Sequence, residues 1–311
     1  MKRVSVVLPT KDRLQHLQQA LPGFLRHDQV AEVIVVIDGC QDGTLAYVRE
    51  QAARNPRVRY VDNVRNRGLP YSRNRGVELA SCEYVFTGED DLELTDGFFD
   101  TLLSHLETSA ADIISGRNIF RHQNETAAEA VSRTDCIGTE SVDRRAIAVH
   151  TGIAARGDQE QPLLPAPMLG SADVFRKIKF DDGYLVNGWR EESDFQLCAR
   201  EQGYRLVYCP HAISFNFMIE NDRGGVHSVG TLRRLRWVIR NNWRFVNKHR
   251  EFIAEEFDIG NPRKYIATFA VQRIRMELVM PLLVKTKRRL LTARPRRAGQ
   301  ADRTRSEDKG T

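Results

Sequence analysis

The chain has 311 residues, of which 41% are hydrophobic and 28% are charged, so it is long enough to bury one large core or two small ones. Its net charge of +6 comes from the end of the chain, because residues 285–311 hold ten Lys and Arg against three Asp and Glu, whereas residues 1–284 hold 37 against 38. A nearly neutral body argues against a protein that binds nucleic acid.

The N-terminal half alternates short apolar runs with helical segments. The first run, VSVVL, starts at Val4 and soon gives way to charged residues, which is typical of a strand and not of a signal peptide. Continuous apolar strands separated by helices indicate an α/β fold with a parallel sheet covered on both faces. The predicted strands are residues 4–8, 32–37, 58–61 and 84–86, and the predicted helices are about 14–26, 45–54 and 71–79.

The loops after these strands are polar. They begin at Pro9, Asp38, Asp62 and Thr87, so in a parallel sheet all four lie at the same edge. Ligands of such sheets bind beyond the carboxyl ends of the strands. We therefore expect a binding site at this edge.

The middle of the chain is less regular. Residues 118–167 show no clear periodicity, and a compact segment follows at 169–175. The acidic stretch 188–195 opens a helix that is predicted to run to about Gln202, where Gly203 ends it. A further strand is predicted at 204–208.

The C-terminal part is predicted to be helical, at about 231–257 and 263–291, and then disordered over the polar residues 292–311. The second of these helices mixes apolar residues with a basic end, which suits peripheral contact with an anionic membrane. The alternative is that its apolar residues pack on the rest of the protein. No apolar run reaches about 18 residues, so no transmembrane helix is predicted.

The five cysteines are scattered and form no CxxC pair. This pattern indicates free thiols in a reducing compartment, with neither a zinc site nor a disulfide framework. The protein is therefore expected to be cytoplasmic, with the inner face of the membrane as a further location if the basic C-terminal part binds lipid.

An acidic cluster, FTGEDDLEL, directly follows the predicted strand at 84–86. In an extended segment Glu89 and Asp91 point to the same side, whereas Asp90 points away. Two carboxylates that converge on one point suit a hard divalent cation, Mg²⁺ or Mn²⁺. The alternative is an acidic loop that only water contacts.

A second acidic cluster, WREESDF, opens the helix near residue 190. Carboxylates in a first turn are favoured by the helix dipole, so capping alone would account for Glu191, Glu192 and Asp194. The neighbouring Trp189 offers an aromatic wall, beside which a partly buried carboxylate would have a pKa suited to a general base. The chain has no GxxxxGK[ST] loop, no GxGxxG after the first strand and no GxSxG turn, which argues against P-loop, dehydrogenase and α/β-hydrolase activities.

Four segments, in order, resemble the family 2 glycosyltransferases, which have the GT-A fold and move a sugar from a nucleoside diphosphate. They are VSVVLPTKDR, VIVVIDGCQDGT, NRGLPYSRNRGVELASCEYVFTGEDD and GWREESDFQLCAREQGYRLVYCPHA. The resemblance implies a Rossmann-like, mostly parallel sheet flanked by helices. It also implies a catalytic domain over 1–222, divided into a nucleotide-binding half (1–91) and an acceptor half (92–222), before a C-terminal helical region (223–291) and a tail (292–311).

The same resemblance implies roles for individual residues. The donor-binding residues would be Pro9, Thr10, Asp38, Arg73 and Asp90, with Thr10 and Asp38 at the nucleoside and Arg73 near the diphosphate. The ligands of a divalent cation would be Glu89 and Asp91. The general base would be Glu192, supported by Glu191 and Asp194.

The chain departs from the family pattern at three positions. Ile37 replaces the first acid of the "DDGS" loop, and Glu89 replaces an Asp. Asn216 stands where the family often has a metal-binding His, and an amide oxygen suits Mg²⁺ better than Mn²⁺. Either Asn216 or His227, in the GGVHS segment, is the candidate third ligand.

The resemblance implies a metal-assisted single displacement with inversion, in which the sugar of a nucleotide-sugar donor passes to a glycan, a lipid-linked or a small-molecule acceptor. Its closest likeness is to bacterial members that act on surface glycans or glycosylated metabolites. Two alternatives stay open. A nucleotidyltransferase would be expected to have a glycine-rich basic loop after the first strand, which LPTKDRLQ is not. An inactive nucleotide-sugar-binding protein would be consistent with Ile37 and Asn216.

Overall fold

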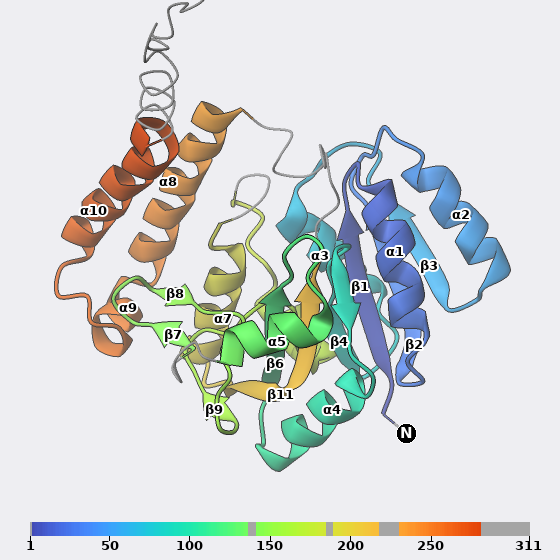
Figure 1. Cartoon of the computed structure of the whole chain (residues 1–311). Coiled ribbons are helices and arrows are strands. Elements are labelled where there is room, and N and C mark those ends of the chain that lie inside the picture. The colour runs from blue at the N-terminus through green and yellow to red at the C-terminus, as the bar shows by residue number, and fades with distance from the viewer. Residues whose placement is uncertain (1, 136–140, 185–188, 218–229, 281–311) are drawn as a thin grey trace, which may run out of the picture.

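The computed structural model describes residues 2–135, 141–184, 189–217 and 230–280 (Figure 1). In this part of the chain the centre is a nine-stranded sheet with the order β3-β2-β1-β4-β10-β6-β11-β5, and β9 pairs with β11 beside that path. Its strands are β1 Val4–Thr10, β2 Val30–Ile37, β3 Val58–Asp62, β4 Tyr84–Thr87, β5 Leu92–Leu94, β6 Ile113–Phe120, β9 Gln159–Glu160, β10 Met168–Ser171 and β11 Leu206–Asn216. A separate antiparallel pair is formed by β7 Val142–Asp143 and β8 Ala148–Val149.

The four strands predicted in the N-terminal half run parallel to one another, as expected, and β6 and β11 form a further parallel pair. β1 lies between β2 and β4, and β3 pairs with the far side of β2. β10 runs antiparallel to both of its neighbours, and β5 runs antiparallel to β11. The other strands on the main path of the sheet all point the same way, so the sheet is mostly parallel. The carboxyl ends of β1, β2, β3 and β4 therefore meet at one edge, which confirms the predicted fold class.

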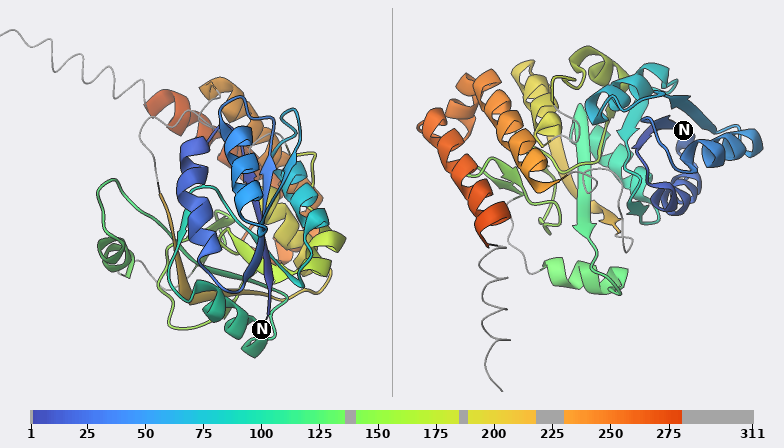
Figure 2. Two further views of the ribbon diagram at one scale, coloured as in Figure 1. Left: turned by 90° about the vertical axis from the view of Figure 1, so that its right-hand side faces the viewer. Right: turned by 90° about the horizontal axis from the view of Figure 1, so that it is seen from above.

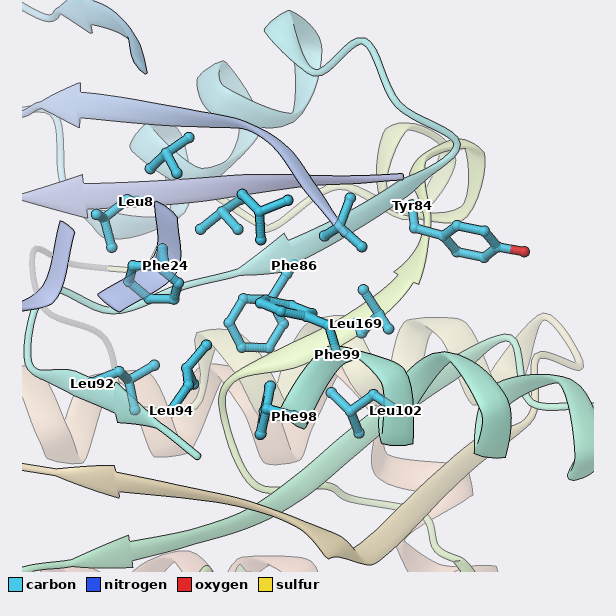
Figure 3. Close-up of a cluster of buried hydrophobic side chains, with 14 of the residues drawn as sticks. Leu8, Phe24, Tyr84, Phe86, Leu92, Leu94, Phe98, Phe99, Leu102 and Leu169 are labelled. Carbon is cyan, nitrogen blue, oxygen red and sulfur yellow. The ribbon is translucent and has the colours of Figure 1, made fainter. Parts of the chain in front are cut away.

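Helices cover both faces of the sheet. One face carries α1 Leu14–Leu25, α2 Thr44–Arg54 and α4 Phe98–Thr108, and the other carries α3 Leu69–Leu79, α6 Ala172–Ile178 and α7 Glu191–Glu201. On the first face the ring of Phe86 meets those of Phe98 and Phe99 at 5.7 and 5.1 Å between centroids (Figure 3). Because every residue of β1 is buried, its alternate side chains supply the cores on both faces.

Two elements of this core, α4 and β6, lie in residues 92–120, most of which the sequence analysis left without an assignment. The apolar spacing of α4 is regular, because Phe98, Leu102 and Leu106 recur every four residues and are all buried. α5, Ala127–Asp135, lies in the segment that showed no periodicity. It stands off from the sheet and packs through Ala130 near the end of β6 (Figure 2).

A glycine sets how closely α3 approaches the sheet. A Cβ atom at Gly76 would lie 2.3 Å from Cγ1 of Val7, so no other residue fits without displacing the helix. This close packing brings Arg73, one turn earlier in α3, to the carboxyl edge of the strands. The fold thus places a buried cation at the edge where the site was expected.

The C-terminal helices pack on α7, at the opposite end of the molecule from α2 (Figures 1 and 2). They are α8 Thr231–Lys248, α9 Arg250–Glu256 and α10 Pro262–Ile274, which continues as a π-helical turn, η2 Arg275–Val279. The single helix predicted over 231–257 is therefore wrong. His249 breaks it, because its backbone leaves the helical region and its buried ring bonds to side chains of α7.

The helix predicted to reach residue 291 can be followed only to Met280, because residues 281–311, with the predicted tail, lie outside the described residues. The predicted domain boundary near 222 also falls outside them. Among the described helices none has the length and hydropathy needed to cross a membrane.

Candidate active site

Asp38, at the end of β2, organises the loop that leads into α3. Its Oδ1 accepts hydrogen bonds from Nδ2 of Asn63 at 3.0 Å and from the backbone N–H of Arg67 at 2.8 Å. Its Oδ2 accepts from the backbone N–H of Gly68 at 2.9 Å, and Gly68 has φ 91°, which favours glycine. The buried carboxylate therefore fixes the N-terminus of α3 and lines the cleft beside it.

A cleft of about 290 Å³ opens at the carboxyl edge of β1, β2 and β4. Its walls include all five residues predicted to bind a donor, together with both predicted carboxylate ligands and Asn216. These are Pro9, Thr10, Asp38, Arg73, Asp90, Glu89, Asp91 and Asn216. The structure thus brings together residues that are up to about 200 positions apart in the chain.

Arg13, which sequence analysis did not single out, ties the acidic triplet to the start of α1. Its Nη1 lies 2.8 Å from Oδ1 of Asp90 and its Nη2 lies 3.0 Å from Oδ2 of Asp91. Asp90 also accepts a hydrogen bond from Oγ1 of Thr10 at 2.7 Å. The only signal in the sequence was a basic residue in the loop after β1, TKDR, which by itself does not reveal a carboxylate partner.

Arg73 links the two acidic clusters. Its Nη2 lies 2.5 Å from Oε1 of Glu192 and 3.6 Å from Oε1 of Glu89, and its Nη1 lies 3.7 Å from Oε1 of Glu191. The side chain is 1% exposed. Burial opposes its charge, but the three glutamates hold the pKa of the guanidinium above its usual value.

The carboxylates around Arg73 outnumber the cations that neutralise them. Burial, followed by the charges of Asp91 and Glu192, raises the pKa of Glu89 to about 8. Burial and the charge of Glu192 raise the pKa of Glu191 to about 7. Such shifts mark a site where negative charge is concentrated and an additional cation would stabilise the charged form.

Oxygen donors of this kind fit the hard cations Mg²⁺ and Mn²⁺. Glu89 and Asp91 line the same cleft, but so does Asp90, because the triplet lies in a turn and not in an extended segment; the prediction that Asp90 points away is wrong. Asn216 is oriented by its neighbours: its Nδ2 donates to Oδ1 of Asp91 at 3.0 Å, and its Oδ1 accepts from Nδ2 of Asn118 at 2.6 Å. Asn118 is fixed in turn by donating to the Ala166 carbonyl, so the Asn216 oxygen faces Asn118 and not Asp91.

A second cleft, of about 410 Å³, adjoins the first. Glu89, Phe120 and Asn216 line both. The second cleft is lined on its other side by Trp189, Glu191 and Glu192 at the start of α7, together with residues of β8 and the 164–166 turn. Glu192, the predicted general base, therefore stands in the second cleft and is joined to the first through Arg73.

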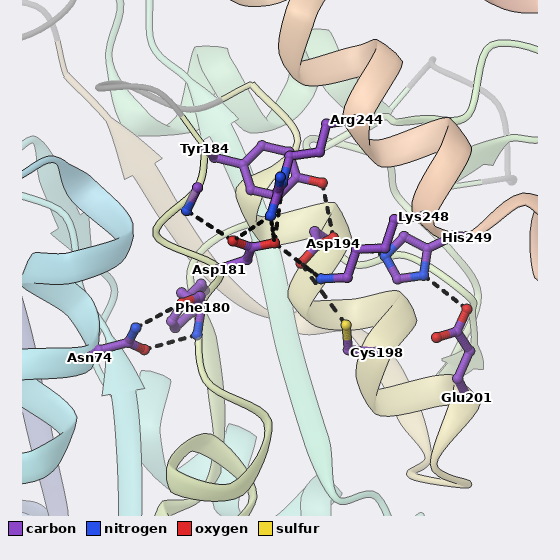
Figure 4. Close-up of polar contacts among 11 residues, drawn as sticks. Asn74, Phe180, Asp181, Tyr184, Asp194, Cys198, Glu201, Arg244, Lys248 and His249 are labelled. Atoms are coloured by element: carbon purple, nitrogen blue, oxygen red, sulfur yellow. Dashed lines mark hydrogen bonds and ion pairs between the residues drawn. The ribbon is translucent and has the colours of Figure 1, made fainter.

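Asp194, predicted to support Glu192, lines neither cleft. It is 1% exposed and bonds to Nζ of Lys248 at 2.8 Å, to Nε2 of His249 at 2.9 Å and to the Tyr184 hydroxyl at 2.9 Å (Figure 4). Burial opposes the charge of His249, but its bonds to Asp194 and Glu201 raise its pKa to about 10. Asp194 thus joins α7 to α8 and α9, and any effect on Glu192 would pass through the position of α7.

Arg190, the residue before α7, was also missed by sequence analysis. It has φ 86°, is buried, and donates from Nε to Oδ1 of Asn242 in α8 at 3.0 Å and from Nη2 to the Tyr265 hydroxyl in α10 at 3.0 Å. Its Nη1 also donates to the carbonyl of Ile147, which lines the second cleft. Arg190 therefore holds the first turn of α7 between the C-terminal helices and the wall of the second cleft.

Two residues singled out in the sequence do not contribute described contacts to the site. His227 lies outside the described residues. Ile37 packs in the core beneath the sheet edge, so its side chain does not line the cleft.

The sequence of the chain is similar to those of known proteins. The sequence model for Glycosyl transferase family 2 matches residues 5–166, which is more than half of the chain. The colanic acid biosynthesis glycosyl transferase WcaA of Escherichia coli, a putative assignment in its name, is 27% identical over 42% of this chain and 47% of its own length. Glycosyltransferase AglE of Haloferax volcanii is 25% identical over 59% of this chain and 63% of its own. The Campylobacter jejuni GalNAc(5)-diNAcBac-PP-undecaprenol beta-1,3-glucosyltransferase is 29% identical over 40% and 41%. The chain thus spans about half the length of the curated relatives that it matches.

Solved structures share the fold. GalNAc-T7 with UDP, GalNAc and Mn²⁺ has a TM-score of 0.61 at 13% identity, covering 79% of this chain and 48% of the other. The mannosyltransferase PcManGT of Pyrobaculum calidifontis, with GDP-Man and Mn²⁺, has a TM-score of 0.57 at 15% identity, covering 94% and 81%. The fold is GT-A, as expected, and the chain belongs to glycosyl transferase family 2.

Proposed function

We propose that the protein moves a glycosyl unit from a nucleoside diphosphate sugar to a hydroxyl group of an acceptor, in a single displacement with inversion that a divalent cation assists. The observation that carries this proposal is the junction of two clefts at Glu89, with Arg73 bonded to the acidic residues of both. A donor in the first cleft would present its sugar to an acceptor in the second.

The donor would lie along the carboxyl edge of β1, β2 and β4. Thr10 and Asp38 would border the nucleoside, with Asp38 acting largely through the loop that it holds, because three donors already occupy its oxygens. Pro9 and Asp90 complete this wall.

Arg73 suits the diphosphate. Among the described residues no hydrogen-bond partner reaches its buried Nε or Nη1. A buried guanidinium with unused N–H groups is matched by phosphate oxygens, which accept such bonds in pairs. A diphosphate would also compete with Glu192 for the guanidinium, so donor binding would weaken the contact that neutralises the carboxylate of Glu192.

Glu89 and Asp91 would hold the cation, since their carboxylates face the first cleft and the local charge favours one. When bound, Mg²⁺ or Mn²⁺ supplies electrophilic stabilisation of the charge that builds on the leaving diphosphate. Asn216 orients Asp91. Its oxygen could bind the cation only if the side-chain amide rotated by half a turn, because its nitrogen now faces Asp91.

Glu192 would take the proton from the attacking hydroxyl. It is partly exposed, opens onto the second cleft and lies beside the residues that the two clefts share. General-base assistance of this kind contributes about 10²- to 10⁴-fold to a rate. The acceptor would be a glycan, a lipid-linked glycan or a small molecule, with Trp189 as an apolar platform at the mouth.

A panel of nucleotide sugars tests the proposal. Thermal shift with and without Mn²⁺ selects the donor, and transfer is then measured as release of the nucleoside diphosphate with candidate acceptors. We expect one donor to stabilise the protein more with Mn²⁺ and to be turned over. Binding without turnover across acceptors would favour the inactive module, and release of inorganic pyrophosphate from a nucleoside triphosphate would favour a nucleotidyltransferase.

A further inference from the structure

A group of metal-binding side chains lies outside both clefts. His105 in α4, Asp158 before β9 and Cys209 in β11 place one nitrogen, one oxygen and one sulfur atom within 4.8 Å of one another. Nδ1 of His105 lies 2.7 Å from Oδ2 of Asp158. The ring of His211 lies 5.3 Å from that of His105, which adds a second imidazole beside the group.

Cys209 lies at a bulge in β11. The pairing of β11 with β6 shifts register between Cys209 and Ile213, so the segment CPHA forms a bulge. Cys209 is fully buried at this bulge. Burial raises the pKa of this thiol to about 11, so a metal ion would have to displace its proton on binding.

We propose that His105, Asp158 and Cys209 form a structural zinc site, with His211 as the additional donor. Zn²⁺ prefers this mixture of imidazole, carboxylate and thiolate in a four-coordinate arrangement. A neutral imidazole, a carboxylate and a thiolate balance its two positive charges. Binding replaces the thiol proton, which passes to the buffer.

Two other groups of the described residues have similar composition, but their donor atoms are already engaged. In the group of Asp194, Cys198 and His249, the carboxylate is neutralised by Lys248, and both His249 nitrogens face carboxylates. A metal there would have to displace Lys248 and remove a proton from His249, whose pKa is raised to about 10.

The third group, Asp12, Cys40 and Asp42, is occupied by backbone groups. Asp42 accepts hydrogen bonds from two backbone N–H groups, and Asp12 accepts one from the backbone N–H of Gln41. Asp12 is also paired with Lys11. By contrast, the side chains of His105 and Asp158 bond to each other.

A metal at His105 would fasten three elements that adjoin one another. α4 would be tied to β11 and to the segment before β9, and β9 itself pairs with β11. A surface cavity of about 380 Å³, lined by residues 156–159, opens at Asp158 and gives an entry path. None of the site's three residues lines either cleft, so the zinc proposal does not depend on the proposed glycosyl transfer.

Cobalt substitution tests the sulfur ligand. The full chain is stripped with a chelator and titrated with Co²⁺ in excess Mg²⁺, which fills sites made of oxygen alone. We expect one equivalent to give thiolate-to-metal charge-transfer absorption that is lost in Cys209→Ser and kept in Cys198→Ser and Cys40→Ser. No such band in the unmodified protein, or a band that persists in Cys209→Ser, would overturn the proposal.

Because Cys209 is buried, its replacement could disturb folding, so two partly exposed ligands provide a second test. His105→Gln and Asp158→Asn are expected to lower Zn²⁺ affinity, measured against a chromophoric chelator, by at least about 100-fold, the upper end of the loss caused by removing an outer-shell partner. Zn²⁺ should raise the melting temperature of the unmodified protein and of the exposed control His122→Gln, but not of these two variants. Equal affinities in all four proteins would contradict the site.

Discussion

At the scale of single residues, the charge balance between the two acidic clusters depends on Arg73. It is the buried cation on which Glu89, Glu191 and Glu192 converge, from segments about 100 positions apart. A buried ion pair is costly to break, because the partner left behind remains charged in a medium of low polarity. The same arrangement leaves the carboxylates responsive to pH, to a cation and to an anionic ligand.

The raised pKa values predict how stability changes with pH when no cation is bound. Glu89 and Glu191 titrate at about 8 and about 7 in the folded protein, above the value near 4.5 of a free glutamate, so the folded state holds more protons than the unfolded state between these values. These groups therefore stabilise the protein fully below about pH 4.5 and lose that contribution as pH rises to about 8.

In EDTA, we expect urea denaturation to give a falling free energy of unfolding from pH 5 to pH 8. The variant Glu89→Gln, which has no proton to lose, should show a shallower fall, and Mn²⁺ should flatten the curve of the unmodified protein. A curve that is equally steep in Glu89→Gln would mean that Glu89 is not the group responsible.

Asp91 tests the cation more directly. Asp91→Asn keeps the shape of the side chain and removes one of the two charges proposed to hold Mg²⁺ or Mn²⁺. We expect transfer to fall by several orders of magnitude and the melting temperature to become insensitive to Mn²⁺. Asp62→Asn, at the end of β3 and outside the residues that line the cleft, is the matched control. Full transfer by Asp91→Asn in EDTA would exclude the cation role.

At the scale of elements, contacts with the C-terminal helices hold the start of α7 in place. Arg190 fastens its start to α8 and α10, and Asp194 fastens its first turns to α8 and His249. The two acids that line the second cleft, Glu191 and Glu192, lie between these anchors. A helix held in this way keeps Glu192 at a constant distance from the shared wall of the two clefts.

Removal of the Asp194 charge is expected to weaken this attachment. Asp194→Asn leaves Lys248 and His249 without their buried counter-charge, and loss of one partner of such a pair costs about 3 kcal/mol or more. Urea denaturation should report this loss, whereas the exposed Asp182→Asn should leave stability unchanged. Donor affinity should change little, because the first cleft is not involved; a loss of donor affinity with unchanged stability would contradict the positioning role.

The sequence was informative wherever local pattern and tertiary structure agree. The parallel strands, their helices and the edge at which Asp38 and the acidic triplet meet were all predicted, because apolar period and polar loops are local signals. The break at His249 was not, since it depends on buried contacts with Asp194 and Glu201 across the fold. Arg13 and Arg190 were missed for the same reason: their partners are distant in sequence.

At the scale of the whole molecule, two of the C-terminal helices, α8 and α10, are rich in basic residues. α8 contains five Arg and no acidic residue, and its exposed side chains include Leu232 and Trp243. α10 has no buried residue and exposes Val271, and the turn η2 that follows it exposes Met276. Arginine, aromatic and aliphatic side chains of this kind suit the surface of an anionic membrane, which is one of the two alternatives that the sequence left open for the C-terminal part.

Liposome co-sedimentation tests this contact. We expect the full chain to sediment with anionic liposomes at low salt, to be released at high salt and to remain soluble with neutral liposomes, since each well-placed Lys or Arg contributes about 1 kcal/mol. A chain that ends at residue 284 should bind more weakly. Failure of the full chain to sediment with anionic liposomes at low salt would rule out the membrane contact.

The most direct test of the proposed function is the pair of constants measured for Glu192→Gln. The substitution is nearly isosteric; it removes the ability to accept a proton and the negative charge that faces Arg73. With the donor identified by the nucleotide-sugar panel, we predict a donor dissociation constant that does not rise, because Glu192 no longer competes for Arg73, and a kcat that falls by about 10²- to 10⁴-fold. An unchanged kcat, or a loss of donor affinity with turnover preserved, would contradict the assignment of Glu192 as the base of a glycosyl transfer.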